Sequence, residues 1–200
     1  MATLGLCIRK SCFDISQPLL RRGNSTSQTA SRLIPLREYF YTIDFHGQLF
    51  LHDTVPKNIA TSFKDKRFLD FFFSRLQIND VNKEYFRQGF AYASPCGREM
   101  NYIQCDDVPV VFTDFDGTCL IWGGTLKWPF DPSSLAMSKS GRVYHNSPLE
   151  IPAPWQTTSA PQAYYGLVKS TLVERFSDAI DTEEHTLTWK GRKHAMKRVE

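Results

Sequence analysis

Two aspartates, Asp114 and Asp116, have the side-chain type and the spacing that could support chemistry in this chain of 200 residues. An apolar run over residues 110–112 precedes them, and Gly117 and Thr118 follow. Two carboxylates at the end of a strand suit phosphoryl transfer, because one can attack phosphorus while the other protonates the leaving oxygen. The same residues could instead close a turn, and the surrounding elements decide between the two interpretations.

Residues 110–118 resemble the first motif of the haloacid-dehalogenase-like phosphatases, in which an apolar strand runs into Asp-x-Asp-Gly-Thr. The resemblance implies that Asp114 is the nucleophile, that Asp116 is the general acid and base, and that Mg²⁺ lies between their carboxylates. A Mg²⁺-dependent haloacid-dehalogenase-like phosphohydrolase that uses Asp114 and Asp116 is therefore our alternative prediction for the function.

The sequence around the motif favours a β-hairpin over this enzyme. Only 83 residues follow Gly117, and they contain one predicted long helix and no second acidic pair of the kind that such a phosphatase needs. Pro109 lies at the start of the strand, where its missing N–H does not suit a central parallel strand. In addition, Asp-Gly is a favoured dipeptide of type I′ hairpin turns.

A repeated sequence pattern also favours the hairpin. Residues 43–51 and 113–121 share the pattern Asp-Phe-x-Gly, followed by residues suited to a strand, at a constant offset of 70. His46 takes the place of Asp116 in the earlier copy, so the shared feature is a turn and not a pair of carboxylates. We therefore predict that the body of the chain contains repeated hairpin units.

A second group of candidate residues lies in the Ser-Pro-Cys-Gly-Arg-Glu segment and consists of Cys96, Arg98 and Glu99. Arg98 beside Cys96 could lower the pKa of the thiol or bind an anion, as in a thiol-based redox or ligand site. Alternatively, the Pro and Gly form a turn and the Arg and Glu form a surface pair. These three residues are our candidates for ligand binding.

The sequence predicts neither a metal site nor a cofactor. The cysteines at 96, 105 and 119 lack Cys-x-x-Cys spacing, and the histidines at 46, 52 and 145 are scattered. Gly123-Gly124 lacks the further glycines of a phosphate-binding loop.

The body, residues 37–200, is predicted to be a single α+β domain with a proline-rich linker over residues 147–163. We expect a mostly antiparallel, twisted sheet of repeated hairpin units with two main helices packed on it, near residues 56–77 and 164–179. Strand-forming residues alternate with turn dipeptides elsewhere. The predicted strands cover residues 39–45, 49–51, 86–93, 100–104, 108–115, 118–122, 126–130, 142–145 and 186–189.

The first 36 residues have the composition of a mitochondrial transit peptide, since they are rich in Arg and Ser, poor in acidic residues and interleaved with apolar side chains. Residues 1–37 hold six basic side chains against one acidic one, which leaves 18 basic and 20 acidic side chains in the rest. The body therefore has no excess of positive charge for nucleic acid, and no apolar run is long enough for a membrane span. We predict a location in mitochondria, in the matrix.

Several segments of the body resemble an uncharacterised eukaryotic family of small, largely mitochondrial proteins, whose human member is known only as a chromosome-8 open reading frame. The resemblance rests on residues 37–41, 47–51, 71–76, 94–99 and 109–113. More distantly, the order of elements resembles a bacterial family of unknown function built from repeated α+β units. These resemblances imply a compartment and no reaction. We predict a non-enzymatic mitochondrial domain that binds a protein or a small molecule.

Overall fold

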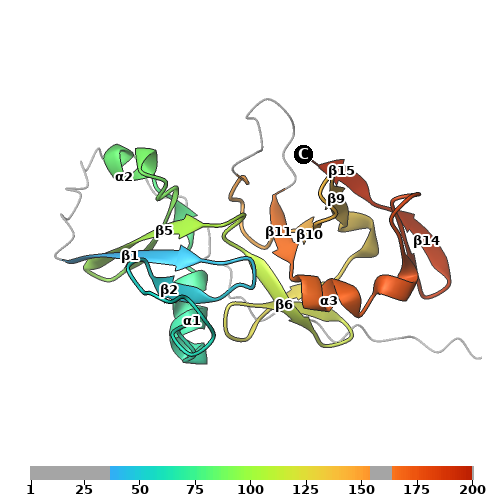
Figure 1. The fold of residues 1–200 in the computed structure, drawn as a ribbon, viewed down its shortest axis with the longest axis horizontal. Helices are drawn as coiled ribbons and strands as arrows, with labels where there is room; N and C mark the ends of the chain where they lie inside the picture. Colours follow the sequence, from blue (N-terminus) through green and yellow to red (C-terminus); the bar gives the residue numbers. More distant parts are fainter. Residues whose placement is uncertain (1–36, 154–163, 200) are drawn as a thin grey trace, which may run out of the picture.

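The computed structural model describes residues 37–153 and 164–199 (Figure 1). The predicted transit peptide, residues 1–36, and most of the predicted linker, residues 154–163, lie outside the described residues. The described chain forms three β-sheets of five, seven and three strands.

The five-stranded sheet contains the first half of the described chain, in the order β2-β1-β5-β4-β3. Its central pair, β1 and β5, is parallel over seven positions, whereas the other neighbours are antiparallel. The strands are β1 (Arg37–Ile43), β2 (Leu49–Leu51), β3 (Gln77–Ile78), β4 (Tyr92–Cys96) and β5 (Glu99–Cys105).

The seven-stranded sheet follows, in the order β15-β9-β10-β11-β6-β7-β8. β11 pairs in parallel with β6, and β15 in parallel with β9, while the remaining neighbours are antiparallel. The strands are β6 (Val111–Phe115), β7 (Cys119–Trp122), β8 (Leu126–Pro129), β9 (Ala136–Ser138), β10 (Val143–Asn146), β11 (Tyr165–Val168) and β15 (Lys197–Val199).

The three-stranded sheet is a small antiparallel unit at the far end of the molecule (Figure 1). Its strands are β12 (Ile180–Asp181), β13 (Thr186–Trp189) and β14 (Arg192–Ala195). The helices of the described residues are short. They are α1 (Lys66–Phe73), α2 (Lys83–Arg87), α3 (Ser170–Glu174) and the 3₁₀ turns η1 (Pro132–Ser134) and η2 (Ser177–Ala179).

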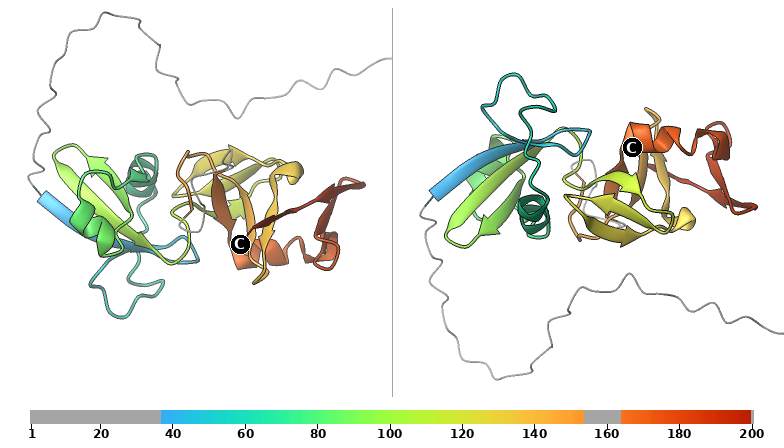
Figure 2. Two further views of the ribbon diagram at one scale, coloured as in Figure 1. Left: turned by 90° about the horizontal axis from the view of Figure 1, so that it is seen from above. Right: turned by 90° about the horizontal axis from the view of Figure 1, so that it is seen from below.

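One continuous hydrophobic core connects the three sheets, with Ile43, Phe112 and Leu187 among its fully buried members. In both views of Figure 2 the five-stranded sheet, together with α1 and α2, forms one end of the molecule, and the seven-stranded sheet lies next to it. α1 lies at the contact between them, because the Asp70 carboxylate accepts hydrogen bonds from the backbone N–H groups of Gly124 and Thr125, at 3.0 and 2.6 Å.

The predicted fold class is wrong. The described chain is mostly β, with three sheets and only short helices, and two main helices packed on one sheet are not present. In the first predicted helix, near residues 56–77, only the eight residues of α1 are helical. The Asn58 side chain accepts hydrogen bonds from the N–H groups of Ala60 and Thr61, and this local turn competes with a helix.

The second predicted helix, near residues 164–179, is divided into β11, α3 and η2. All four residues of β11 are buried between two neighbouring strands, and periodicity alone does not distinguish such an apolar run from a buried helix. Gly166 is the signal that the prediction missed. A Cβ at this position would lie 2.7 Å from the Phe112 ring, so the sheet requires a glycine there.

The strand predictions succeed better than the helix predictions. Strands lie at the predicted places in β1, β2, β5, β6, β7, β8, β10 and β13. The strand predicted over residues 86–93 is partly wrong, because Phe86 and Arg87 belong to α2 and β4 begins at Tyr92. Among the described residues, no helix is long and apolar enough to cross a membrane.

Candidate functional site

Asp114 lies in β6, and its carboxylate binds a cation of this chain. Oδ1 accepts the backbone N–H of Phe115 at 2.8 Å and the Arg175 Nη1 at 2.6 Å. The hydrogen bond from Phe115 and the neighbouring guanidinium lower the pKa of the Asp114 carboxyl. The carboxylate therefore belongs to a surface ion pair that connects β6 to the end of α3.

Asp116 follows β6 and organises the turn into β7. Its Oδ1 accepts the N–H groups of Thr118 and Cys119, at 3.0 and 2.7 Å, and its Oδ2 lies 2.8 Å from the Lys127 Nζ. The Lys127 ammonium and these backbone donors hold the pKa of the Asp116 carboxyl far below its usual range.

The turn itself differs from the predicted type I′ turn. The Asp116 N–H donates to the Cys119 carbonyl at 3.1 Å, so Gly117 and Thr118 are the two central residues. Gly117 has a φ of 99°, whereas Thr118 has no positive φ. Glycine at the first central position is typical of a type II′ turn.

The predicted phosphatase site is not assembled in the part of the chain that the structure describes. Asp114 and Asp116 each bind a different basic side chain, Arg175 and Lys127. No group of three or more His, Cys, Asp or Glu side chains with metal-binding geometry occurs among residues 37–153 and 164–199. β6 continues directly into an antiparallel partner, which is a hairpin and not a strand–helix unit.

The repeated sequence pattern does not correspond to a structural repeat in the same register. Asp44 accepts the N–H groups of His46 and Gln48 with its Oδ1, at 2.9 and 2.8 Å. By this bonding Asp44 corresponds to Asp116, and not to Asp114 as the offset of 70 predicts. Both segments are hairpins, but the turn of the second begins two residues later in the shared pattern and its loop is one residue shorter.

Cys96, Arg98 and Glu99 lie together at the turn between β4 and β5. They line a shallow pocket of about 260 Å³ together with Arg37, whose Nη1 lies 3.3 Å from the Glu99 Oε1 in an exposed ion pair. The sequence analysis missed Arg37, because only the parallel pairing of β1 with β5 places it opposite Glu99. Ligand binding by these residues stays a prediction.

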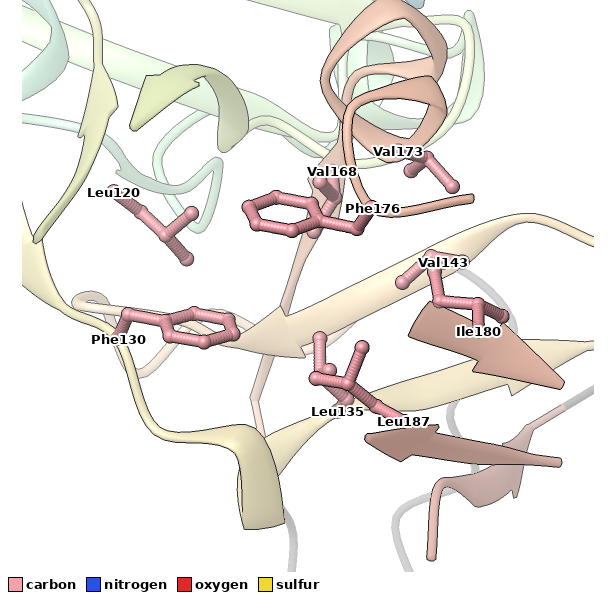
Figure 3. A pocket seen from close by; sticks show the side chains of 9 residues that line it. All are labelled: Leu120, Phe130, Leu135, Val143, Val168, Val173, Phe176, Ile180 and Leu187. Carbon is pink, nitrogen blue, oxygen red and sulfur yellow. The ribbon is translucent and has the colours of Figure 1, made fainter. Parts of the chain in front are cut away.

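A second pocket is part of the hydrophobic core (Figure 3). Its volume is about 10 Å³, and apolar side chains surround it. A space of this volume has no room for an organic ligand, and a cavity without polar partners does not hold ordered water. This space is therefore a packing gap. Its lining residues are Leu120, Phe130, Leu135, Val143, Val168, Val173, Phe176, Ile180 and Leu187.

A third and larger pocket opens where the β1–β2 turn meets the seven-stranded sheet. This junction pocket has a volume of about 510 Å³. Its floor is apolar and buried, whereas its rim is exposed and, apart from Phe45, polar. The floor consists of Val143, Leu167 and Val168, and the rim includes Phe45, His46, Ser140, Arg142, Ser170 and Glu174.

A buried carboxylate fixes Arg142 at the rim of the junction pocket. The Asp107 side chain, in the link between β5 and β6, is only 4% exposed. Its Oδ2 accepts hydrogen bonds from the Arg142 Nη1 at 2.9 Å and from the Tyr144 hydroxyl at 2.8 Å. Burial and the bond to Asp107 raise the pKa of Tyr144 to about 12, so its hydroxyl remains a donor. The Phe45 ring packs on the other side, with the Arg142 Cζ at 4.4 Å from its centroid.

Sequence reasoning missed this network. Asp107 lies between two predicted strands and Arg142 starts another, and 35 residues separate the two charges. A local pattern does not signal such a contact, because only the packing of the link against β10 brings the two side chains together.

His145 in β10 has a structural role. It is fully buried, its Nε2 accepts the Asp131 N–H at 3.0 Å, and its Nδ1 donates to the Asn146 carbonyl at 2.9 Å. Burial lowers the pKa of the imidazole, and the neutral ring supplies the one acceptor and one donor that its neighbours need.

A family model described as a domain of unknown function, DUF4505, matches residues 28–199. The chain belongs to this family. The predicted membership in an uncharacterised family is thereby confirmed, whereas its eukaryotic and mitochondrial character stays a prediction.

Two solved structures of bacterial DUF1285 family proteins are similar to this chain. The protein from Shewanella baltica OS155 is 16% identical, with a TM-score of 0.43, and the match covers 72% of this chain and 94% of that one. The protein from Silicibacter pomeroyi DSS-3 is 13% identical, with a TM-score of 0.45, and the match covers 82% of each chain.

The lowered pKa of His145 predicts a pH dependence of stability. Below the unfolded-state pKa of about 6.5 the unfolded chain binds a proton that the native chain excludes, so the free energy of unfolding falls as the pH falls, by at most about 1.4 kcal/mol per pH unit. A His145→Gln variant keeps a donor and an acceptor but does not titrate, and we expect it to lose this part of the slope.

Urea unfolding between pH 7.5 and 5 measures the effect, with His46→Gln, which removes an exposed imidazole, as the control. Equal slopes for the wild type and the His145→Gln variant would contradict the assignment.

Proposed function

We propose that this protein is a non-enzymatic mitochondrial binding domain and that its ligand occupies the junction pocket. The observation that carries the proposal is the pocket itself, which combines a volume of about 510 Å³ with an apolar floor and a polar rim. Pockets for small molecules have volumes of roughly 300–1,000 Å³, apolar walls and a few fixed polar groups, and they occur preferentially at junctions between structural units.

The rigidity of the rim supports this proposal. Arg142 is held by Asp107 and by the Phe45 ring, so binding a ligand would cost little additional ordering of this long side chain. The floor strands β10 and β11 are central in their sheet and are paired with each other. A ligand would therefore meet a surface that is already formed.

The state of the two aspartates supports a non-enzymatic role. A phosphatase of this kind needs both carboxylates to face one metal ion and one phosphate, yet Oδ1 of Asp114 is bound to Arg175, and both oxygens of Asp116 are bound to Lys127 and to backbone N–H groups. The function therefore lies in binding at the pocket and not in phosphoryl transfer at the hairpin.

A fragment screen by thermal shift tests the use of the pocket, with two tryptophan substitutions as matched variants. Ser170 lines the pocket, whereas Ser177 is also exposed but lies outside it. We expect compounds from the screen to stabilise the wild type and the Ser177→Trp variant, and to lose at least about tenfold in affinity for the Ser170→Trp variant, in which the indole fills the space.

Failure of every compound to discriminate between the two variants would contradict the proposed site. Equal binding to both variants would place the ligand elsewhere on the surface, and an absence of any binding would count against a small-molecule role.

The mitochondrial location rests on the composition of residues 1–36 alone. N-terminal sequencing of the protein from isolated mitochondria tests it. We expect a mature N-terminus close to residue 37, and an intact Met1 in that fraction would contradict the prediction.

A further inference from the structure

We infer that the ligand of the junction pocket is a monocarboxylate with an apolar chain, whose carboxylate binds Arg142 while the chain lies on the floor. This inference rests on the proposed function and adds the chemical class of the ligand. Three features of the pocket carry it: the anchored guanidinium, the composition of the floor and the charges on the rim.

The guanidinium of Arg142 is available to an anion. Its side chain remains 44% exposed although it is paired with Asp107. A guanidinium has five N–H donors in a planar fork, and the hydrogen bonds of Arg142 to Asp107 and to the Tyr144 hydroxyl use only part of them. The fork matches the two oxygens of a carboxylate, so an external carboxylate can bind without displacing Asp107.

The Asp107 carboxylate does not cancel the attraction of this site for anions. It is buried, and its Oδ2 already accepts a second hydrogen bond, from the Tyr144 hydroxyl. Part of its negative charge is therefore stabilised by a neutral donor, whereas the guanidinium faces solvent.

The floor selects the rest of the ligand. Val143 and Val168 are buried and also border the core gap, so the apolar surface that the pocket offers to a ligand comes from Leu167 and from the more exposed Val173 and Phe45. A hydrocarbon chain on this floor would gain about 25 cal/mol for each Å² of apolar surface removed from water. A compact hydrophilic anion would gain nothing from the floor.

The rim limits the charge of the ligand. Glu174 lines the same pocket as Arg142, and it contributes a negative charge on the side of α3. A second negative charge on the ligand would meet this carboxylate and the buried Asp107 without a further fixed cation among the described lining residues. The pocket therefore favours a singly charged carboxylate over a dianionic phosphate.

Titration of the ¹⁵N-labelled protein with octanoate tests the inference, and octylamine and octyl phosphate serve as probes with the same chain. We expect octanoate to shift the amide resonances of Ser140, Gly141 and Arg142 with saturation at one site. Octylamine and octyl phosphate should bind at least about tenfold more weakly, and the Arg142→Gln variant should lose at least about tenfold in affinity for octanoate.

Glu174→Gln is the second variant, because Arg142→Gln leaves Asp107 without its cation and can unfold the protein. Removal of the Glu174 charge should increase the affinity for octanoate about threefold, and also reduce the preference over octyl phosphate. Unchanged or weaker octanoate binding by this variant would overturn the inference, as would equal binding of octylamine, or unaltered binding by a folded Arg142→Gln protein.

The outcomes separate this inference from the proposed function. If octanoate fails to bind while the Ser170→Trp substitution abolishes the binding of other compounds, the ligand class is wrong and the pocket remains the site. If no compound distinguishes Ser170→Trp from Ser177→Trp, both proposals fail.

Discussion

The pairing of a buried carboxylate, Asp107, with Arg142 and Tyr144 is the constraint on which the rest of the structure depends. A carboxylate that is only 4% exposed is costly, by several kcal/mol, unless donors surround it. Asp107 lies in the link that carries the chain from the five-stranded to the seven-stranded sheet, and both donors come from the start of β10 and the turn before it. The same contact therefore fixes the path of the link and places a guanidinium at the pocket.

The remaining contacts at this junction follow from that arrangement. The β1–β2 turn lies so close to β6 that a Cβ at Gly47 would be 3.0 Å from the Val111 and Thr113 side chains. On the α1 side, Asp70 binds the turn between β7 and β8, and the Phe73 ring packs edge-on against Trp122. Each of these contacts is weak on its own, but together they hold the two sheets around one hydrophobic core. The junction pocket remains between the turns.

The sequence predicts the local elements of this fold better than its architecture. Turn dipeptides and strand formers locate most strands. The helix predicted over residues 164–179 fails because a buried central strand and a buried helix have similar apolar patterns, and Gly166 was the one residue that argued for the strand. The candidate site shows the same limit. The conspicuous pair of Asp114 and Asp116 stabilises a hairpin, whereas Asp107 and Arg142 carry no local motif and meet only through tertiary packing.

A double-mutant cycle between Asp107 and Arg142 tests the central claim most directly. The free energies of unfolding of the wild type, Asp107→Asn, Arg142→Gln and the double variant would be measured by urea denaturation at pH 7. If the pair anchors the junction, the coupling energy is about 1–3 kcal/mol in favour of the native pair. A coupling energy below about 0.3 kcal/mol, within the range expected of independent sites, would contradict it.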